Sequence, residues 1–266
     1  MSKALLTKLW ERALPPTCAL CHQITQSDAV CTTCETSLPW ILLPCIQCGL
    51  PLTNHLLADT YCGRCLQTPP PWHQLLSPYL YHWPVSTLIA RFKYRRDLIA
   101  GNALSQLLSR HLFAHYESAE NCLDLPHWPD LLIPVPLHWR RQWWRGFNQT
   151  EWLAHRLLHH LSQMLQKPGG QLYRLPTLKR DYCRRLRHTP NQKGLSQRYR
   201  KHNLDRAFEF PVVLNGQHVA LLDDVVTTGS TVAEISRGLS AAGAGNITVW
   251  SLCRTSLTPR SGSPLE

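Results

Sequence analysis

Residues 219–231 read VALLDDVVTTGST, and this stretch decides the fold. Four apolar residues, expected as a buried strand, end at two adjacent carboxylates, Asp223 and Asp224. Two valines then lead into a Thr/Gly/Ser cluster, and a helical pattern follows. A strand, a tight loop and a helix in this order are typical of an open α/β sheet, in which ligands bind at the carboxyl ends of the strands.

The chemistry of this stretch favours two kinds of ligand group. Small loop residues and a helix N-terminus present backbone N–H groups to an anion such as phosphate. The carboxylates of Asp223 and Asp224 need a neutral or cationic partner, such as ribose hydroxyls or Mg²⁺. The alternative is a core strand followed by a helix capped by Ser230 or Thr231, but adjacent carboxylates on a buried strand are costly unless they are used. A Walker-B strand would require a GxxxxGK[ST] loop, which the sequence lacks.

The rest of the second half alternates helices and strands. The patterns predict, in chain order, a helix over 86–112 broken near Gly101, a strand over 131–135, a helix over 148–165, a strand over 219–222, a helix over 230–242 and a strand over 247–252. Gly243 suits the position just after a helix. Strands that alternate with helices predict a parallel sheet.

Eight of the eleven cysteines form four C-x-x-C pairs in the first part of the chain. These are Cys18/Cys21, Cys31/Cys34, Cys45/Cys48 and Cys62/Cys65. Two such turns supply the four thiolates of a tetrahedral zinc site, so the pattern predicts structural zinc, as one or two ions. The pairs could be used in chain order or interleaved, with the first and third pairs sharing a metal.

Other uses of these cysteines fit less well. A disulfide framework would require an export signal, and the N-terminal residues have no continuous apolar segment of that kind. A thioredoxin-like site needs one C-x-x-C, not four. Four cysteines also ligate iron–sulfur clusters, so an iron–sulfur site stays an alternative to zinc.

These patterns divide the chain into parts. We expect an amphipathic helix and a zinc-binding module in residues 1–68, a proline-rich spacer in 69–78, an α/β domain in 79–256 and a flexible tail in 257–266. A metal would supply the folding energy that the small cysteine-rich module lacks. No run of 18 apolar residues occurs, which argues against a transmembrane segment and for a cytoplasmic protein. The N-terminal helix could instead attach the protein peripherally to the inner membrane.

The positive charge is concentrated in one segment. The formal net charge is +11. Residues 174–206 hold eleven Lys and Arg against two Asp, whereas residues 1–68 hold four basic and four acidic side chains. Interleaved tyrosines, such as Tyr182 and Tyr199, would suit single-stranded DNA, which stacks its bases on aromatic rings.

A second cationic segment lies at 132–149, LIPVPLHWRRQWWRGFNQ. A short strand leads into a loop that contains Arg140, Arg141 and Arg145, and a helix begins near Asn148. Guanidinium groups bind phosphate oxygens bidentately, so this loop is a candidate pyrophosphate site. The alternative is a solvated basic face beside tryptophans that cover the edge of the core.

The stretch at 219–231 resembles the phosphoribosyl-pyrophosphate (PRPP) signature of type I phosphoribosyltransferases. The resemblance implies an α/β fold of that type, with a parallel sheet flanked by helices. It also implies Mg²⁺ bound with PRPP, with Asp223 and Asp224 as the catalytic pair on the ribose hydroxyls. The further substrate-binding residues implied are Thr227, Thr228, Gly229, Ser230 and Thr231 around the 5′-phosphate and Arg145, Gly146 and Asn148 near the pyrophosphate.

Within that fold the chain resembles the ComF/GntX family, and GntX members most closely. The patterns that carry this are the four C-x-x-C pairs, Phe92-Lys93-Tyr94, Arg145-Gly146-Phe147-Asn148-Gln149, Thr189…Gln192…Leu195 and Arg198…Asn203…Ala207-Phe208, over about residues 18–254. The family is linked to competence and to the use of extracellular DNA as a nutrient.

Two function classes remain from the sequence. The first is an enzyme of nucleoside metabolism that transfers a phosphoribosyl group to a nitrogen acceptor. The second is a non-catalytic zinc-finger protein that binds single-stranded DNA through residues 174–206, or a partner in the DNA-uptake machinery, with PRPP as regulator. Thr227 keeps both open, because some purine-specific members of the fold place an acid there as general base.

Overall fold

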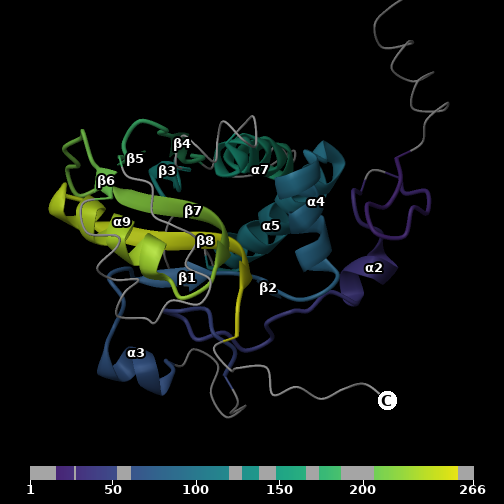
Figure 1. Ribbon diagram of the computed structural model, residues 1–266, viewed down its shortest axis with the longest axis horizontal. Coiled ribbons are helices and arrows are strands. Elements are labelled where there is room, and N and C mark those ends of the chain that lie inside the picture. The colour runs from purple at the N-terminus through teal and green to yellow at the C-terminus, as the bar shows by residue number, and fades with distance from the viewer. Residues whose placement is uncertain are drawn as a thin grey trace, which may run out of the picture.

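A parallel sheet forms the centre of the molecule (Figure 1). The computed structural model describes residues 16–26, 28–52, 61–119, 128–137, 148–165, 174–186 and 207–256. In the described chain the strands are β1 (Gln74–Leu76), β2 (Tyr79–Leu80), β3 (Leu131–Pro134), β4 (Thr177–Leu178), β5 (Arg184–Arg185), β6 (Phe208–Glu209), β7 (His218–Val226) and β8 (Asn246–Arg254). The sheet order is β1-β8-β7-β3-β4, and β2 also pairs with β8. All these pairs are parallel, as predicted.

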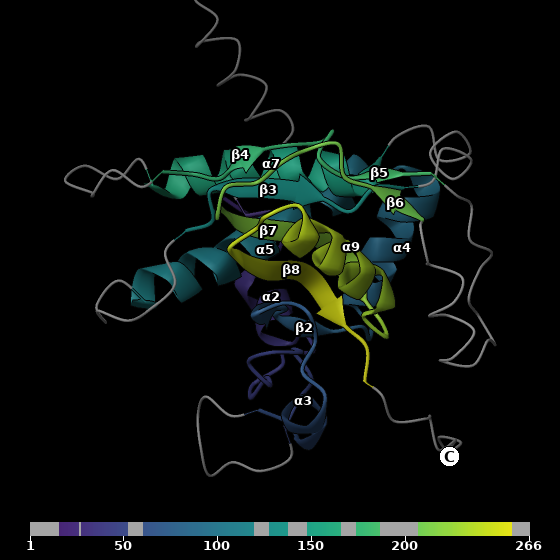
Figure 2. The ribbon, with the colours of Figure 1, turned by 90° about the vertical axis from the view of Figure 1, so that its left-hand side faces the viewer.

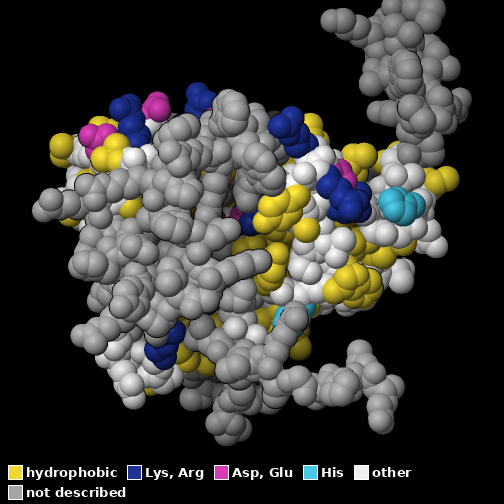
Figure 3. Space-filling view, viewed as in Figure 1, with side chains coloured by type: hydrophobic (Ala, Val, Ile, Leu, Met, Phe, Trp, Pro, Cys, Tyr) yellow, Lys and Arg dark blue, Asp and Glu magenta, His cyan; other side chains and the backbone are white. Residues whose placement is uncertain are grey.

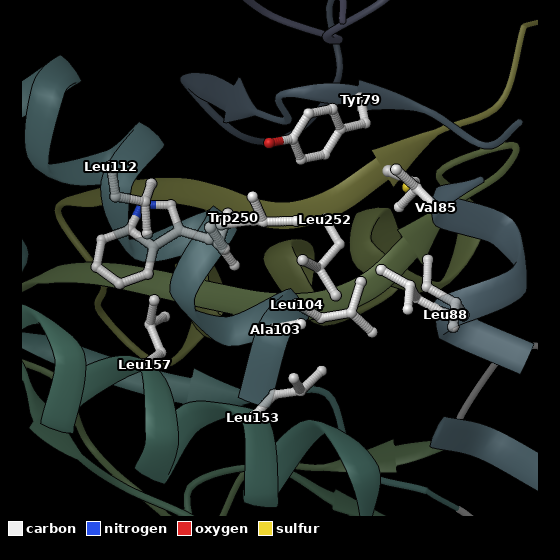
Figure 4. Close-up of a cluster of buried hydrophobic side chains, with 14 of the residues drawn as sticks. Tyr79, Val85, Leu88, Ala103, Leu104, Leu112, Leu153, Leu157, Trp250 and Leu252 are labelled. Atoms are coloured by element: carbon white, nitrogen blue, oxygen red, sulfur yellow. The ribbon is translucent and has the colours of Figure 1, made fainter. Parts of the chain in front are cut away.

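Side chains of the central strands alternate between two cores. Ala220, Leu222 and Leu252 point to one face, and Val219 and Leu221 point to the other. The first face is covered by α4 (Val85–Arg95), α5 (Leu98–Ala119) and α7 (Gln149–Leu165), and the second by α9 (Ser230–Ala241). Figure 4 shows the first core, where side chains from three helices meet those of β8. Because both faces are covered, the middle of β7, residues 219–222, is a continuous apolar run, as expected of a parallel sheet.

The helical segment near Gly101 breaks earlier than predicted. Arg96 adopts a left-handed conformation, with φ of 54°, and separates α4 from α5. Asp97 then accepts the backbone N–H of Ala100 at 3.0 Å. Gly101 lies inside α5, where a Cβ atom would approach the Phe92 ring to 2.6 Å. Its lack of a side chain serves close packing rather than helix termination.

The cysteine-rich part contains two short helices, α2 (Thr32–Thr36) and α3 (Gly63–Gln67). They lie well apart in Figure 1, and in Figure 2 α3 lies below the sheet. Each cysteine group therefore meets a different part of the α/β domain. Within the segment expected as a spacer, Gln74–Leu76 form β1 and pair with β8. The domain limits given above stay a prediction.

No helix in the described part of the chain is long and apolar enough to cross a membrane. Two expectations about the ends fall outside the described residues, namely the amphipathic helix before residue 16 and the tail after residue 256. The proposed cytoplasmic location and peripheral membrane attachment stay predictions.

Candidate functional site

Asp223 and Asp224 lie near the carboxyl end of β7, between β3 and β8. The backbone N–H of Asp224 donates a hydrogen bond to Asp223 Oδ1 at 2.9 Å. From α4, Lys93 Nζ forms an ion pair with Asp224 Oδ2 at 2.8 Å, and both side chains are largely buried. A lysine about 130 residues away in the sequence thus neutralises part of the charge that the two carboxylates bring together.

The environment of Asp223 disfavours its charged form. Protein atoms enclose its carboxyl group, although the residue as a whole keeps some exposed surface. Burial, and next the charge of Asp224, raise the pKa of Asp223 to about 7, while the charge of Lys93 opposes the rise. A carboxyl group that changes charge near neutral pH at a strand end is typical of a functional site.

The predicted phosphate loop follows directly. Gly229 has a φ of 80°, a conformation that glycine adopts without strain, and α9 begins at the next residue. Thr228 Oγ1 lies 3.0 Å from Ser230 Oγ, so two hydroxyls face each other at the start of α9. The N-terminus of a helix of this length attracts anions.

The second predicted locus is described only in part. Residues 138–147, with the three arginines and Gly146, lie outside the described residues. Asn148 precedes α7, and its Oδ1 accepts a hydrogen bond from the hydroxyl of Thr150 at 3.2 Å. That hydroxyl also donates to Val135 O at 3.0 Å. Thr150 therefore joins the segment that follows β3 to the start of α7 and contacts Asn148, at the same edge of the sheet as Asp224.

The eight paired cysteines form two clusters. The first cluster holds Cys18, Cys21, Cys31 and Cys34, and the second holds Cys45, Cys48, Cys62 and Cys65; in each, the ligand atoms lie within 4.8 Å of one another. The pairs are thus used in chain order, and the interleaved alternative is wrong. Two sulfur–sulfur distances are 3.7 Å (Cys21–Cys31) and 3.6 Å (Cys48–Cys62).

These distances fit a metal and not a disulfide. Four sulfurs about 2.3 Å from a tetrahedral zinc ion are separated by about 3.8 Å, whereas a disulfide joins them at about 2.05 Å. Hydrogen bonds from the Cys48 thiol and from backbone N–H groups lower the pKa of Cys45, while the hydrogen bond to Cys45 and burial raise the pKa of Cys48. Thiolates are the form that binds zinc. The donor set therefore fits two Cys₄ zinc sites.

The described part of the basic segment makes internal contacts. Arg180 pairs with Glu151 of α7 at 2.5 Å, and the Arg185 guanidinium lies 5.4 Å from the centre of the Phe208 ring. Arg184 is exposed. Residues 187–206, which hold much of the predicted DNA-binding charge, lie outside the described residues.

Known proteins resemble this chain in both of its parts. Residues 9–66 match the model of the double zinc ribbon domain. The DNA utilization protein YhgH of Salmonella typhi is 38% identical over 244 residues, which cover 91% of this chain and 98% of that protein. Competence protein F of Haemophilus influenzae is 35% identical over 85% of this chain and 91% of its own length.

The chain belongs to the ComF family. This identity over nearly the full length confirms the resemblance drawn from the motifs. Among solved structures, a hypoxanthine phosphoribosyl transferase of Trypanosoma cruzi is 12% identical, covers 61% of this chain and 70% of its own, and has a TM-score of 0.36. A purine phosphoribosyltransferase of Pyrococcus horikoshii is 18% identical, covers 60% and 92%, and has a TM-score of 0.28. These likenesses are weak, and the fold class rests on the strand order itself.

Sequence reasoning assigned no role to two residues that lie at the candidate site of this ComF chain. Lys93 was part of a family pattern only, and nothing in α4 indicated that it would reach Asp224. Arg254, at the end of β8, is buried and donates hydrogen bonds to the carbonyl groups of Val226 and Thr227, where the predicted phosphate loop begins. A single basic residue at the end of an apolar strand was the only signal for it.

Proposed function

We propose that the chain binds PRPP at the carboxyl edge of β7 and transfers its phosphoribosyl group to a nitrogen acceptor. One observation carries the proposal. Asp223 and Asp224 lie near the carboxyl end of the central parallel strand, which ends two residues later at Val226 and leads into a loop that opens α9. The two carboxylates can accept hydrogen bonds from ribose hydroxyls. The backbone N–H groups of the loop and of the helix N-terminus can donate to the 5′-phosphate.

The residues of the site would have separate roles. Asp224 and Asp223 orient the ribose, and residues 227–231 hold the phosphate. Lys93 is already within 2.8 Å of Asp224, so its ammonium group lies where the negative charge of a phosphorylated ligand would gather. Arg145, Gly146 and Asn148, which precede α7 in the sequence, are proposed for the pyrophosphate. Carboxylate and phosphate oxygens suit Mg²⁺, which would neutralise the leaving pyrophosphate.

The reaction proposed is displacement of pyrophosphate from ribose C1 by a nitrogen nucleophile. The bond from C1 to the pyrophosphate oxygen breaks, a bond from C1 to nitrogen forms, and the nitrogen loses a proton. The protein contributes position and electrostatics rather than covalent chemistry. Thr227 stands where some purine-specific members of the fold place an acid that acts as general base. The proposed acceptor is therefore a nitrogen group that is nucleophilic without a base at position 227.

Pyrophosphate release tests the catalytic part. The zinc-loaded full chain is incubated with PRPP, Mg²⁺ and a panel of purine, pyrimidine and amine acceptors. We expect release that depends on one class of acceptor and that falls about a hundredfold or more in Asp224→Asn. PRPP binding without release for any acceptor would favour the non-catalytic alternative, in which PRPP is a regulator.

The surface beside the site supports that second candidate, a protein that binds single-stranded DNA. Directly after Lys93, the residues Tyr94, Arg95 and Arg96 are exposed, Tyr94 by 62%. Leu98 and Ile99 continue this exposed surface, and they are 51% and 65% exposed. Figure 3 shows hydrophobic side chains beside Lys and Arg in the region of α4. Exposed rings beside cations suit unpaired bases, and the names of the relatives mention DNA.

Binding of a single-stranded oligonucleotide, followed by fluorescence anisotropy, tests this candidate. We expect an affinity that falls steeply with salt and that drops about tenfold in Tyr94→Ala. Tyr61→Ala, at another exposed tyrosine, serves as the matched control. Equal losses in both variants, or no binding at low salt, would contradict a DNA surface on α4.

A further inference from the structure

The second cysteine cluster is hydrogen-bonded to the α/β domain through three consecutive carbonyl groups. Ile46 O accepts the backbone N–H of Leu75 at 3.1 Å, and Gln47 O accepts Trp72 Nε1 at 2.6 Å. Cys48 O accepts Arg254 Nε at 2.9 Å. Cys45 and Cys48 of this turn belong to the cluster, and the backbone N–H of Cys62 donates to Cys45 Sγ at 3.2 Å. One turn of backbone thus serves the metal ligands on one side and the α/β domain on the other.

Arg254 continues this connection to the phosphate loop. Its side chain is buried, with the residue 3% exposed. While Nε bonds to Cys48 O, Nη1 donates to Val226 O at 2.9 Å and also to Thr227 O. The folded protein loses much stability if the acceptors of a buried guanidinium move away, because the charge is then left without hydrogen-bond partners or water. The planar group therefore fixes Cys48 relative to the first residues of the loop.

Trp72 makes a second, independent connection. Its indole N–H holds Gln47 O, and its ring lies against Gly229, where a Cβ atom would come within 3.2 Å of it. Trp72 is 7% exposed, so its ring is held in place by its surroundings. The loop is thus contacted at its start by Arg254 and at its glycine by Trp72. Both residues are bonded to the same cysteine turn.

The first cluster is attached elsewhere. Ala19 O accepts Arg91 Nη1 of α4 at 2.8 Å, and Glu35 accepts Arg110 Nη1 of α5 at 2.6 Å. Ala29 N donates to Gln106 of α5 at 2.7 Å. In the described chain these bonds lead to helices and not to residues 226–229. Metal at the first cluster would therefore hold residues that are bonded to α4 and α5, whereas metal at the second would hold the turn that is bonded to Trp72 and Arg254.

We infer that the second metal site positions the phosphate loop, and that Arg254 and Trp72 are the positioning residues that connect the two. Metal bound at the second cluster fixes the turn at 46–48, the turn fixes Arg254 and Trp72, and these fix residues 226–229. The coupling itself needs only these contacts. Its consequence for PRPP rests on the function proposed above.

Hydrogen exchange of the full chain, loaded with zinc, tests the coupling. Exchange is measured by mass spectrometry for the peptide that covers 226–231 and for α5 as a reference. We expect Cys45→Ser and Arg254→Met to speed exchange of the loop about tenfold, while α5 exchanges as in the unchanged protein. Cys18→Ser, the matched change in the first cluster, should leave the loop as it was.

Zinc content separates coupling from metal loss. Arg254→Met should keep both zinc ions and still loosen the loop, and Arg254→Lys should lie between it and the unchanged protein. Trp72→Phe keeps a ring but removes the donor to Gln47, so it tests the second connection without a large change in packing. If the loop exchanges at the original rate in Cys45→Ser and in Arg254→Met, the inference is wrong.

PRPP affinity then tests the consequence. Arg254→Met should bind PRPP about tenfold more weakly, because a loose loop must be ordered on binding. If the unchanged protein does not bind PRPP at all, the proposed function fails while a faster exchange in Arg254→Met would still support the coupling. If PRPP binds equally well to both, the coupling has no effect on the ligand site.

Discussion

At the scale of the residue, the site depends on two carboxylates that would repel each other in isolation. Asp224 is balanced by Lys93 at 2.8 Å, whereas Asp223 is buried beside the charge of Asp224. The sequence predicted the pair and its place at a strand end. It could not predict Lys93, because a contact between α4 and β7 depends on how the helix packs on the sheet and not on spacing along the chain.

Asp223 gives the protein a defined dependence of stability on pH. Because burial and Asp224 raise its pKa to about 7, from about 3.9 in an unfolded chain, folding favours its protonated form. Its contribution to stability is complete below about pH 4 and is lost as the pH rises through about 7. The Asp223→Asn variant does not undergo this loss. As the pH rises over that range, we therefore expect the variant to become more stable relative to the unchanged protein.

Urea denaturation of both proteins across this pH range measures the difference. Asp130→Asn is a suitable control, because Asp130 lies at the opposite edge of the sheet and bonds to the backbone N–H of His218. Free energies of unfolding for Asp223→Asn and the unchanged protein that stay parallel at every pH would contradict the raised pKa.

At the scale of the element, periodicity predicted which segments are helices and strands but misplaced one boundary. Gly101 indicated a break on conformational grounds, whereas the chain turns at Arg96 and continues through Gly101. A glycine in a helix can mark either an end or a close contact, and the sequence does not say what packs against it. Here the rings of Phe92 and Trp152 do, 5.2 Å apart between centres.

Substitution of this glycine tests that explanation. In an open helix Gly→Ala stabilises by about 1 kcal/mol, but the new Cβ of Gly101→Ala would lie 2.6 Å from Phe92 and 2.7 Å from Trp152. Overpacking costs about 1–3 kcal/mol, so after the helix gain we expect a net loss of up to about 2 kcal/mol in the free energy of unfolding.

The control for this change is Gly63→Ala in α3, where a Cβ atom would meet nothing within 4 Å. We expect that variant to be stabilised by up to about 1 kcal/mol in thermal or urea denaturation, because nothing opposes the helix gain there. A stabilised Gly101→Ala would show that the contact with the two rings does not constrain the helix.

At the scale of the whole molecule, the cysteine spacing predicted metal sites but not how they are built into the fold. The C-x-x-C pattern allowed two pairings, and only the distances between sulfurs separate them. The first cluster is bonded to α4 and α5, and the second to β1 through Leu75 and to β8 through Arg254. These contacts join residues far apart in sequence, such as Cys48 and Arg254, so no local pattern contains them.

Calorimetric titration of PRPP with Mg²⁺ into the zinc-loaded full chain tests the central claim most directly. The site at the end of β7 predicts saturable binding of one PRPP per chain that weakens about tenfold or more in Asp224→Asn and is retained in Asp130→Asn. Absence of binding to the unchanged protein, or equal affinity in Asp224→Asn, would contradict a PRPP site at this edge of the sheet.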